Sequence, residues 1–186
     1  MPSRNLTDSE ISSILPLLSI RDRALFTLGI RSGFRVSELL SIKVSDCIQH
    51  DAIRDTLTVT RSRMKGKRAS RTIPLHSEAK RAIAHLILEY NLTPESYLFQ
   101  SRKGINQPIE PRQVNRILKA AVNRLGLAGS ISSHSMRKTL ANRVYLASGK
   151  DIIATRDALG HSNSSSTSHY LAVSQEVVDA LILGIK

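Results

Sequence analysis

The chain has 186 residues, enough for one compact domain with a substantial core and too few for two comfortable ones. Lysine and arginine number 27 against 15 acidic residues, so the formal net charge is +12 and the surface should attract polyanions such as nucleic acid. Charge alone leaves a second explanation equally open, because basic residues also keep a protein soluble. We therefore expect a single domain over residues 1–186, with nucleic acid as the first candidate partner.

Cysteine usage and apolar runs exclude several classes of protein. Cys47 is the only cysteine, so an intrachain disulfide cannot form, and no Cys/His cluster has zinc-ligand spacing. The N-terminus lacks the apolar core of a signal peptide, and no apolar run is long enough to span a membrane. We expect a soluble, cytoplasmic protein that has no metal site and makes no membrane contact.

The first forty residues are predicted to form three helices. Thr7 and Glu10 have capping-box spacing, in which each side chain binds a free amide at a helix start, so a helix is expected over 7–18. A second apolar-periodic stretch over 21–30 ends at Gly33, because glycine permits the left-handed turn that commonly stops a helix. A short third helix is expected to begin near Arg35.

The rest of the chain alternates once between helix and strand patterns. β-Branched, alternating segments over 56–60 and 71–75 flank a very basic loop and predict a small antiparallel sheet. Helical periodicity then returns, and we expect a mainly α fold with a small three-stranded antiparallel β-sheet. The later helices are predicted over 77–90, 111–125, 133–147 and 151–159, with two short segments around Tyr170 and over 177–183.

Metal-free phosphodiester transfer needs a nucleophile, cations for the phosphoryl oxygens, and proton donors and acceptors. His134 and Arg137 are three positions apart in a predicted helix, so their side chains share one face and can reach a single phosphate. Tyr170 lies nine positions after His161, which follows a predicted helix end at Gly160. Each signal is weak alone, because basic helix faces and tyrosines at a core edge are common.

The combination of these features is far more specific than any one of them. Residues 33–40, Gly-Phe-Arg-Val-Ser-Glu-Leu-Leu, are similar to the first arginine box of the tyrosine recombinases, the family of phage integrases and bacterial site-specific recombinases. The basic hairpin loop, the His134/Arg137 pair, His161 and Tyr170 follow in that family's order and rough spacing. The resemblance covers residues 6–171 and implies that family's catalytic-domain fold, which breaks and rejoins DNA.

The resemblance implies a covalent mechanism. Tyr170 would attack the scissile phosphate to give a 3′-phosphotyrosine and a free 5′-hydroxyl. Arg35 and Arg137 would hold the nonbridging oxygens, a task suited to forked and permanently charged guanidinium groups. Because the phosphotyrosine conserves the bond energy, no ATP and no other cofactor is expected.

Three further residues receive supporting roles from the same resemblance. His134 would assist proton transfer involving the tyrosine, and His161 would hydrogen-bond a nonbridging oxygen. Glu38, in the first arginine box, would orient neighbouring catalytic groups, although a surface acid on a helix would look the same in sequence.

The family also places a lysine in the hairpin loop, where it protonates the leaving 5′-oxygen. Both Lys65 and Lys67 are in reach, and Lys65, followed by glycine, matches the local motif better. The remaining basic residues of this region are candidates for contacts to the DNA backbone. We expect such contacts from Arg61, Arg63, Lys67 and Arg68 of this loop. We also expect one from Lys138, which directly follows Arg137.

The chain departs from most members of the family at its start. Most carry an N-terminal helical domain that closes around DNA, and this sequence is expected to lack that core-binding domain. The partner implied is double-stranded DNA, with a monomer in solution and a homotetramer on paired DNA sites. Two alternatives stay open: a non-catalytic DNA-binding regulator derived from a recombinase, and an enzyme like the type IB topoisomerases.

Overall fold

The computed structural model describes residues 3–63 and 70–160. The chain divides into two compact units, Met1–Leu140 and Ala141–Lys186, and the single domain expected from chain length stays a prediction. In chain order, the helices and strands of the described ranges are α1 (Asp8–Ile14), η1 (Leu15–Leu17), α2 (Ile20–Ser32), α3 (Val36–Leu40), α4 (Val44–Cys47), β1 (Ile48–Gln49), β2 (Ala52–Ile53), β3 (Thr56–Val59), η2 (Arg61–Arg63), β4 (Arg71–Pro74), α5 (Ser77–Glu89), α6 (Pro111–Arg124), α7 (Ser133–Ala147) and α8 (Ile152–Leu159).

The start of the chain confirms the predicted capping box. The Glu10 amide donates to Thr7 Oγ1 at 3.2 Å, and the Thr7 amide donates to Glu10 Oε2 at 2.9 Å. The expected helix over 7–18 is shorter than predicted, because α1 ends at Ile14 and passes into the 3₁₀ turn η1. Pro16 lies in that turn and has no amide with which to continue an α-helix.

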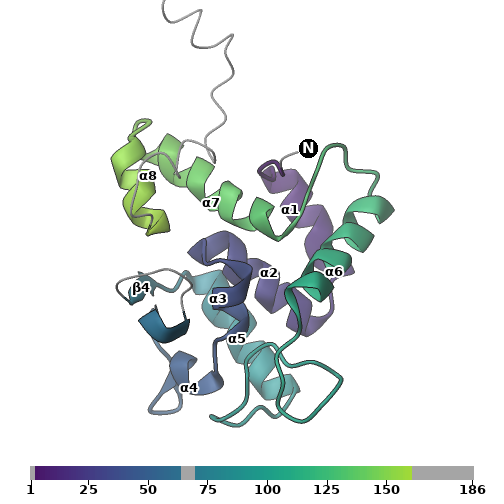
Figure 1. The fold of residues 1–186 in the computed structure, drawn as a ribbon, viewed down its shortest axis with the longest axis vertical. Coiled ribbons are helices and arrows are strands. Elements are labelled where there is room, and N and C mark those ends of the chain that lie inside the picture. Colours follow the sequence, from purple (N-terminus) through teal and green to yellow (C-terminus); the bar gives the residue numbers. More distant parts are fainter. Residues whose placement is uncertain (1–2, 64–69, 161–186) are drawn as a thin grey trace, which may run out of the picture. The chain divides into compact units, whose positions relative to one another are not determined.

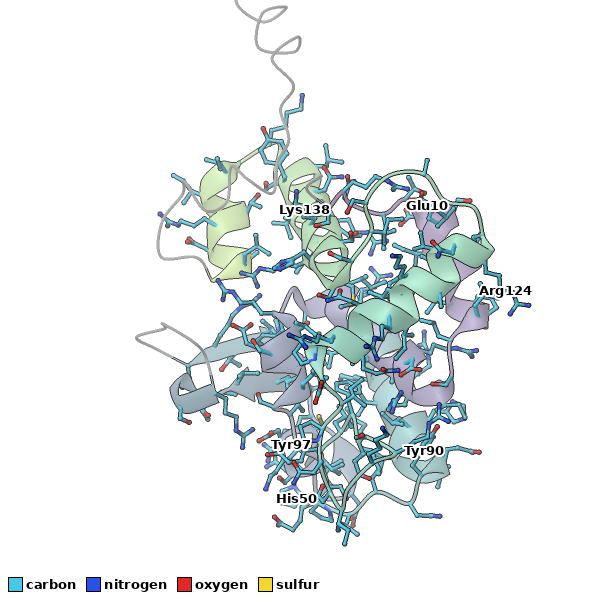
Figure 2. All side chains as sticks on the ribbon, turned by 45° about the vertical axis from the view of Figure 1, so that its right-hand side comes forward. Glu10, His50, Tyr90, Tyr97, Arg124 and Lys138 are labelled. Atoms are coloured by element: carbon cyan, nitrogen blue, oxygen red, sulfur yellow. The ribbon has the colours of Figure 1, made fainter. Side chains whose placement is uncertain are left out.

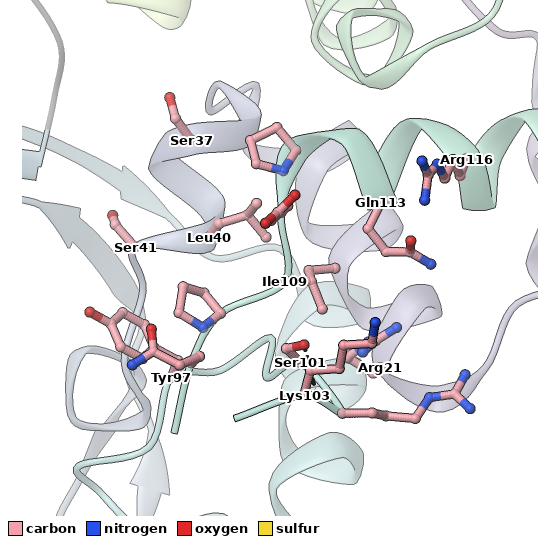
Figure 3. A pocket seen from close by; sticks show the side chains of 15 residues that line it. Arg21, Ser37, Leu40, Ser41, Tyr97, Ser101, Lys103, Ile109, Gln113 and Arg116 are labelled. Carbon is pink, nitrogen blue, oxygen red and sulfur yellow. Dashed lines mark hydrogen bonds between the residues drawn. The ribbon is translucent and has the colours of Figure 1, made fainter. Parts of the chain in front are cut away.

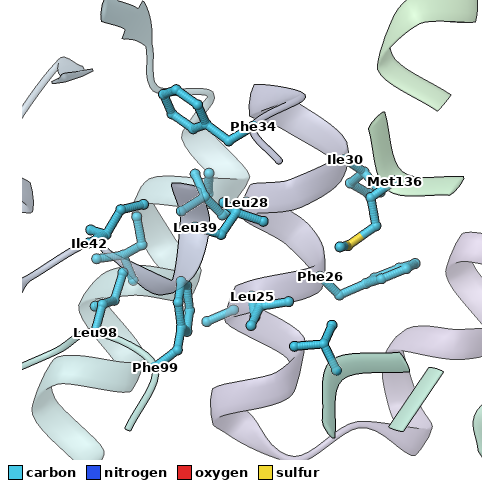
Figure 4. Packing of buried hydrophobic residues seen from close by; sticks show 14 of the residues in the cluster. Leu25, Phe26, Leu28, Ile30, Phe34, Leu39, Ile42, Leu98, Phe99 and Met136 are labelled. Atoms are coloured by element: carbon cyan, nitrogen blue, oxygen red, sulfur yellow. The ribbon is translucent and has the colours of Figure 1, made fainter. Parts of the chain in front are cut away.

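Helix α2 lies in the middle of the first unit, with α5 packed along it (Figure 1). It stops where the sequence predicts, at Gly33, whose φ of 59° is left-handed. The buried side chains of α2 form the centre of the hydrophobic core together with residues of α3 and of the segment before α6 (Figure 4). They include Leu25, Phe26, Leu28, Ile30, Phe34, Leu39, Ile42, Leu98 and Phe99.

The predicted pairing of the two alternating segments is confirmed. Strands β3 and β4 are antiparallel, with Leu57 opposite Ile73. The sheet differs from the expected three-stranded one, because the described strands form two separate two-stranded sheets, β1–β2 and β3–β4. Strands β1 and β2 pair only with each other through a two-residue turn, His50-Asp51, in which both φ angles are positive.

The four helices predicted over 77–90, 111–125, 133–147 and 151–159 are present. Helices α5, α6 and α7 lie within one residue of their expected bounds. Helix α8 is capped by Asp151, which accepts from two amides, and ends at Gly160 with a φ of 62°. The segments expected around Tyr170 and over 177–183 lie outside the described residues. Among the helices of the described ranges, none has both the length and the apolar character that a membrane crossing needs.

Helices α2 and α7 approach closely at a glycine. A methyl group added at Gly29 would lie 2.5 Å from the sulfur of Met136 and 3.3 Å from its Cβ. Met136 is buried and lies between His134 and Arg137 in the sequence, so this contact seats the start of α7 on α2.

We predict that Gly29→Ala lowers the free energy of unfolding, because overpacking of about 1–3 kcal/mol outweighs the gain of about 1 kcal/mol in helix propensity. In a Met136→Ala background the same substitution should be neutral or stabilising, because the space is then open. Urea denaturation of the four proteins of this double-mutant cycle measures the coupling. Additive effects would show that the two helices do not meet at this point.

Candidate active site

The structure describes about half of the predicted site residues. Those whose side chains it describes are Arg35, Glu38, Arg63, His134, Arg137 and Lys138. Those that lie outside the described residues are Lys65, Lys67, Arg68, His161 and Tyr170. The backbone of Arg61 is part of η2, and its side chain belongs with the undescribed positions.

Arg35 and Glu38 form a closed pair at the start of α3. The Arg35 amide donates to Glu38 Oε2 at 2.8 Å, and its guanidinium donates to Glu38 Oε1 at 3.0 Å. The Glu38 side chain is 1% exposed and that of Arg35 is 34% exposed, so a buried carboxylate binds a partly exposed guanidinium group. This geometry is what an orienting role of Glu38 requires.

The start of α7, which carries His134 and Arg137, is positioned by a residue of α6. Asn115 Oδ1 accepts a hydrogen bond from the Ser133 amide at 2.9 Å and so satisfies one of the free amides in the first turn. Near the same end of the helix, Thr139 Oγ1 accepts from the amide of Leu6 at 2.9 Å. Contacts from distant parts of the chain thus fix the position of this helix turn.

Arg137 reaches the first arginine box through the backbone of the α2–α3 turn. Its side chain is 1% exposed, and its Nη1 donates to the carbonyl oxygen of Gly33, two residues before Arg35. The structure thereby brings together the two arginines that the sequence places about one hundred residues apart.

A third arginine joins this turn, and sequence reasoning missed it. Arg71 of β4 donates from Nη2 to the carbonyl oxygen of Ser32 at 2.8 Å, and its guanidinium lies 4.8 Å from the centre of the Phe34 ring. A signal was present in the sequence, because Arg71 shares the inward-facing register of its strand with Ile73 and Leu75. An arginine at a core position of an alternating strand indicates a specific partner.

The three arginines leave this site with excess positive charge. Burial, together with the positive charges of Arg137 and Arg35, lowers the pKa of Arg71 to about 10, while Glu38 opposes the shift. Arg71 is still protonated at neutral pH. Among the described side chains of this cluster, three guanidinium groups and one carboxylate give a net charge of +2, which suits an anionic ligand.

The surroundings of His134 lower its pKa and so favour its neutral form. Partial burial of the ring lowers its pKa below the ordinary 6.5, and the positive charges of Arg137, Arg35 and Lys138 act in the same direction. At neutral pH the imidazole is therefore able to accept a proton, as a general base must.

The remaining predicted DNA contacts differ in their surroundings. Arg63 is paired with Asp46, with 2.5 Å between Nη1 and Oδ2, so its guanidinium serves an ion pair within the protein. Lys138 lies on α7, directly after Arg137, and Figure 2 shows its place on that helix.

A pocket of about 1030 Å³ lies beside α3 and the start of α6, and sequence reasoning did not anticipate it (Figure 3). Its walls carry four basic side chains and one acidic one: Arg21, Arg102, Lys103, Arg116 and Glu110. The residues that line it do not include Arg35, His134 or Arg137, so it is separate from the arginine cluster.

We predict that proton NMR titration of the free protein gives His134 a pKa below 6.5, and that Arg35→Gln raises it, because one of the positive charges that oppose protonation is removed. Arg54→Gln removes the same charge elsewhere in the first unit and should leave the titration unchanged. A pKa at or above 6.5 in the unmodified protein would contradict the neutral, proton-accepting state.

Comparison with known sequences places this chain in a family. Residues 4–176 match the phage integrase family. A tyrosine recombinase of Pseudothermotoga lettingae is 35% identical over 179 residues, covering 95% of this chain and 59% of the relative. Tyrosine recombinase XerC of Bacillus subtilis is 34% identical over 176 residues, covering 91% and 55%. The probable integrase/recombinase YoeC of Bacillus subtilis is 32% identical over 182 residues, covering 96% and 93%.

This chain therefore spans a little over half the length of the first two relatives. Solved structures agree with the fold. The XerA recombinase superimposes with a TM-score of 0.75 at 22% identity, over 97% of this chain and 62% of that one. XerH bound to its difH substrate gives 0.71 at 21% identity, over 96% and 53%. The predicted fold class is confirmed, and the chain belongs to the phage integrase family of tyrosine recombinases.

Proposed function

We propose that this chain is the catalytic part of a site-specific DNA recombinase that cleaves and rejoins DNA through a 3′-phosphotyrosine. The observation that carries the proposal is the meeting of Arg71 and Arg137 at the turn that precedes Arg35. Among the described residues, these arginines with Glu38 carry a net charge of +2, next to a histidine whose lowered pKa favours the neutral form.

The charge of the cluster suits phosphoryl transfer. A DNA phosphodiester carries one negative charge, and attack by an anionic nucleophile adds a second in the transition state. An excess of two positive charges therefore complements the transition state better than the ground state, which is the condition for lowering the barrier. A guanidinium group does this without changing its protonation state, since it is permanently charged.

Tyr170 is the proposed nucleophile. A free tyrosine has a pKa of about 10, so it attacks at neutral pH only if a base or nearby cations favour the phenolate. His134 is the proposed base, and Arg35 and Arg137 supply the cations. His161 is proposed to bind a nonbridging oxygen, and the leaving 5′-oxygen takes its proton from a lysine.

The proposed partner is double-stranded DNA, bound by a monomer that assembles into a tetramer on paired sites. The basic composition and the basic pocket beside α3 and α6 support binding of a polyanion. The phosphotyrosine retains the energy of the phosphodiester bond, so rejoining needs neither ATP nor a metal ion in this proposal.

The first test is covalent capture. A DNA duplex that carries the cognate site and a nick beside the scissile phosphate should trap a covalent adduct with the unmodified chain, because the short product strand diffuses away before religation. Tyr170→Phe should give no adduct, since it lacks the attacking oxygen, and Tyr90→Phe should behave as the unmodified chain. Denaturing gel electrophoresis of labelled DNA measures all three.

The outcome also decides between the alternatives. Salt-sensitive binding without any adduct would replace the proposal by a DNA-binding regulator. An adduct together with relaxation of supercoiled plasmids that lack a recombination site, and no strand exchange, would indicate an enzyme like the type IB topoisomerases.

The second test identifies the acid. Lys65→Ala should slow cleavage by about 100-fold, because the leaving 5′-oxygen lacks a proton donor. A substrate with sulfur in place of that oxygen needs no proton on the leaving group, so it should restore the rate of Lys65→Ala. Lys67→Ala is the matched control and should weaken DNA binding on both substrates. Sulfur rescue of Lys67→Ala alone would exchange the two roles.

A further inference from the structure

Arg71 has no part in the reaction as proposed above, and its surroundings are unusual. It is 9% exposed, on the inward face of β4 beside Ile73, which is buried to the same extent. Burial of a guanidinium is costly unless its donors are bound and its charge is balanced. The contacts of Arg71 therefore indicate the role of this side chain.

Its contacts include three consecutive residues immediately before Arg35. Arg71 Nη2 donates to the Ser32 carbonyl at 2.8 Å, and Nη1 is 3.5 Å from the Gly33 carbonyl. The guanidinium also covers the ring of Phe34 at 4.8 Å.

The carbonyl groups concerned belong to the C-terminal end of α2. Such carbonyls lack an amide partner within the helix and carry the negative end of the helix dipole. A cation that donates hydrogen bonds to them stabilises both the helix end and the left-handed conformation of Gly33, where the chain turns towards Arg35. Arg137 binds the same Gly33 carbonyl from α7.

We infer that Arg71 is a positioning residue of the cleavage site, which fixes the α2–α3 turn so that Arg35 and Arg137 hold the scissile phosphate together. The inference rests on the proposed function, because it assigns Arg35 and Arg137 to the phosphate. It also ties β4, which follows the segment of Lys65 and Lys67 in the sequence, to the first arginine box.

The first experiment compares Arg71→Lys with Ile73→Val in the absence of DNA. Lysine keeps the positive charge but cannot bind two carbonyls and cover a ring at once. His134 should then titrate at a higher pKa, towards 6.5, because Arg35 and Arg137 are no longer held beside it. Ile73→Val disturbs the same strand at equal burial and should leave the titration unchanged. His134→Gln assigns the signal among the six histidines.

The second experiment measures single-turnover cleavage of the nicked duplex at saturating DNA. Arg71→Lys should lower the rate of adduct formation by about 10- to 100-fold with little change in the dissociation constant for DNA. Ile73→Val should keep the rate of the unmodified chain even if its melting temperature falls. Phe34→Leu removes the stacked ring from the other side of the contact and should shift both readouts in the same direction, so it replaces Arg71→Lys if that variant does not fold.

Each outcome decides the matter. An unchanged His134 titration in both variants overturns the inference. If the cleavage rate is also unchanged, Arg71 is a structural residue. If the cleavage rate is lost, Arg71 contacts the phosphate itself. If the unmodified chain forms no adduct, the proposed function fails, and the titration still judges whether Arg71 positions its neighbours.

Discussion

The binding of two guanidinium groups by the carbonyls at the end of α2 is the interaction on which the rest of the site depends. Arg71 from β4 and Arg137 from α7 both donate to this turn. Since Arg35 follows the turn directly, its position is set by the same contacts. A helix end whose carbonyls lack amide partners within the helix thus binds two cations that would otherwise repel one another, directly before a third, Arg35.

The gathering of like charges has a chemical consequence. Glu38 is buried and is the carboxylate that the described residues place against this cluster of three positive charges. Burial of the ring lowers the pKa of His134, and the positive charges of Arg137, Arg35 and Lys138 act in the same direction, so the neutral imidazole is favoured. The positive cluster and the neutral state of His134 therefore both arise from the folding of the first unit.

Local signals predicted most of the architecture because caps and turns act over a few residues. The Thr7–Glu10 capping box, the helix ends at Gly33 and Gly160, and the pairing of β3 with β4 were all predictable from sequence. The two separate sheets were not predicted. The tight turn between β1 and β2 favours pairing of these two strands with each other over their pairing within a wider sheet. The basic pocket was equally hidden, since its lining comes from segments up to about ninety-five residues apart.

The sequence by itself determined the helical periods, the capping residues and the family motif, from which Arg35, Glu38, His134 and Arg137 were identified. Each of these signals is carried by residues close in the chain or by a motif order. Only the tertiary structure decided that Arg71 belongs with them and that Arg71 and Arg137 both donate to the turn at Ser32 and Gly33. The contacts responsible join residues 39 and 104 positions apart, and no local pattern of side chains encodes a hydrogen bond to a distant backbone carbonyl.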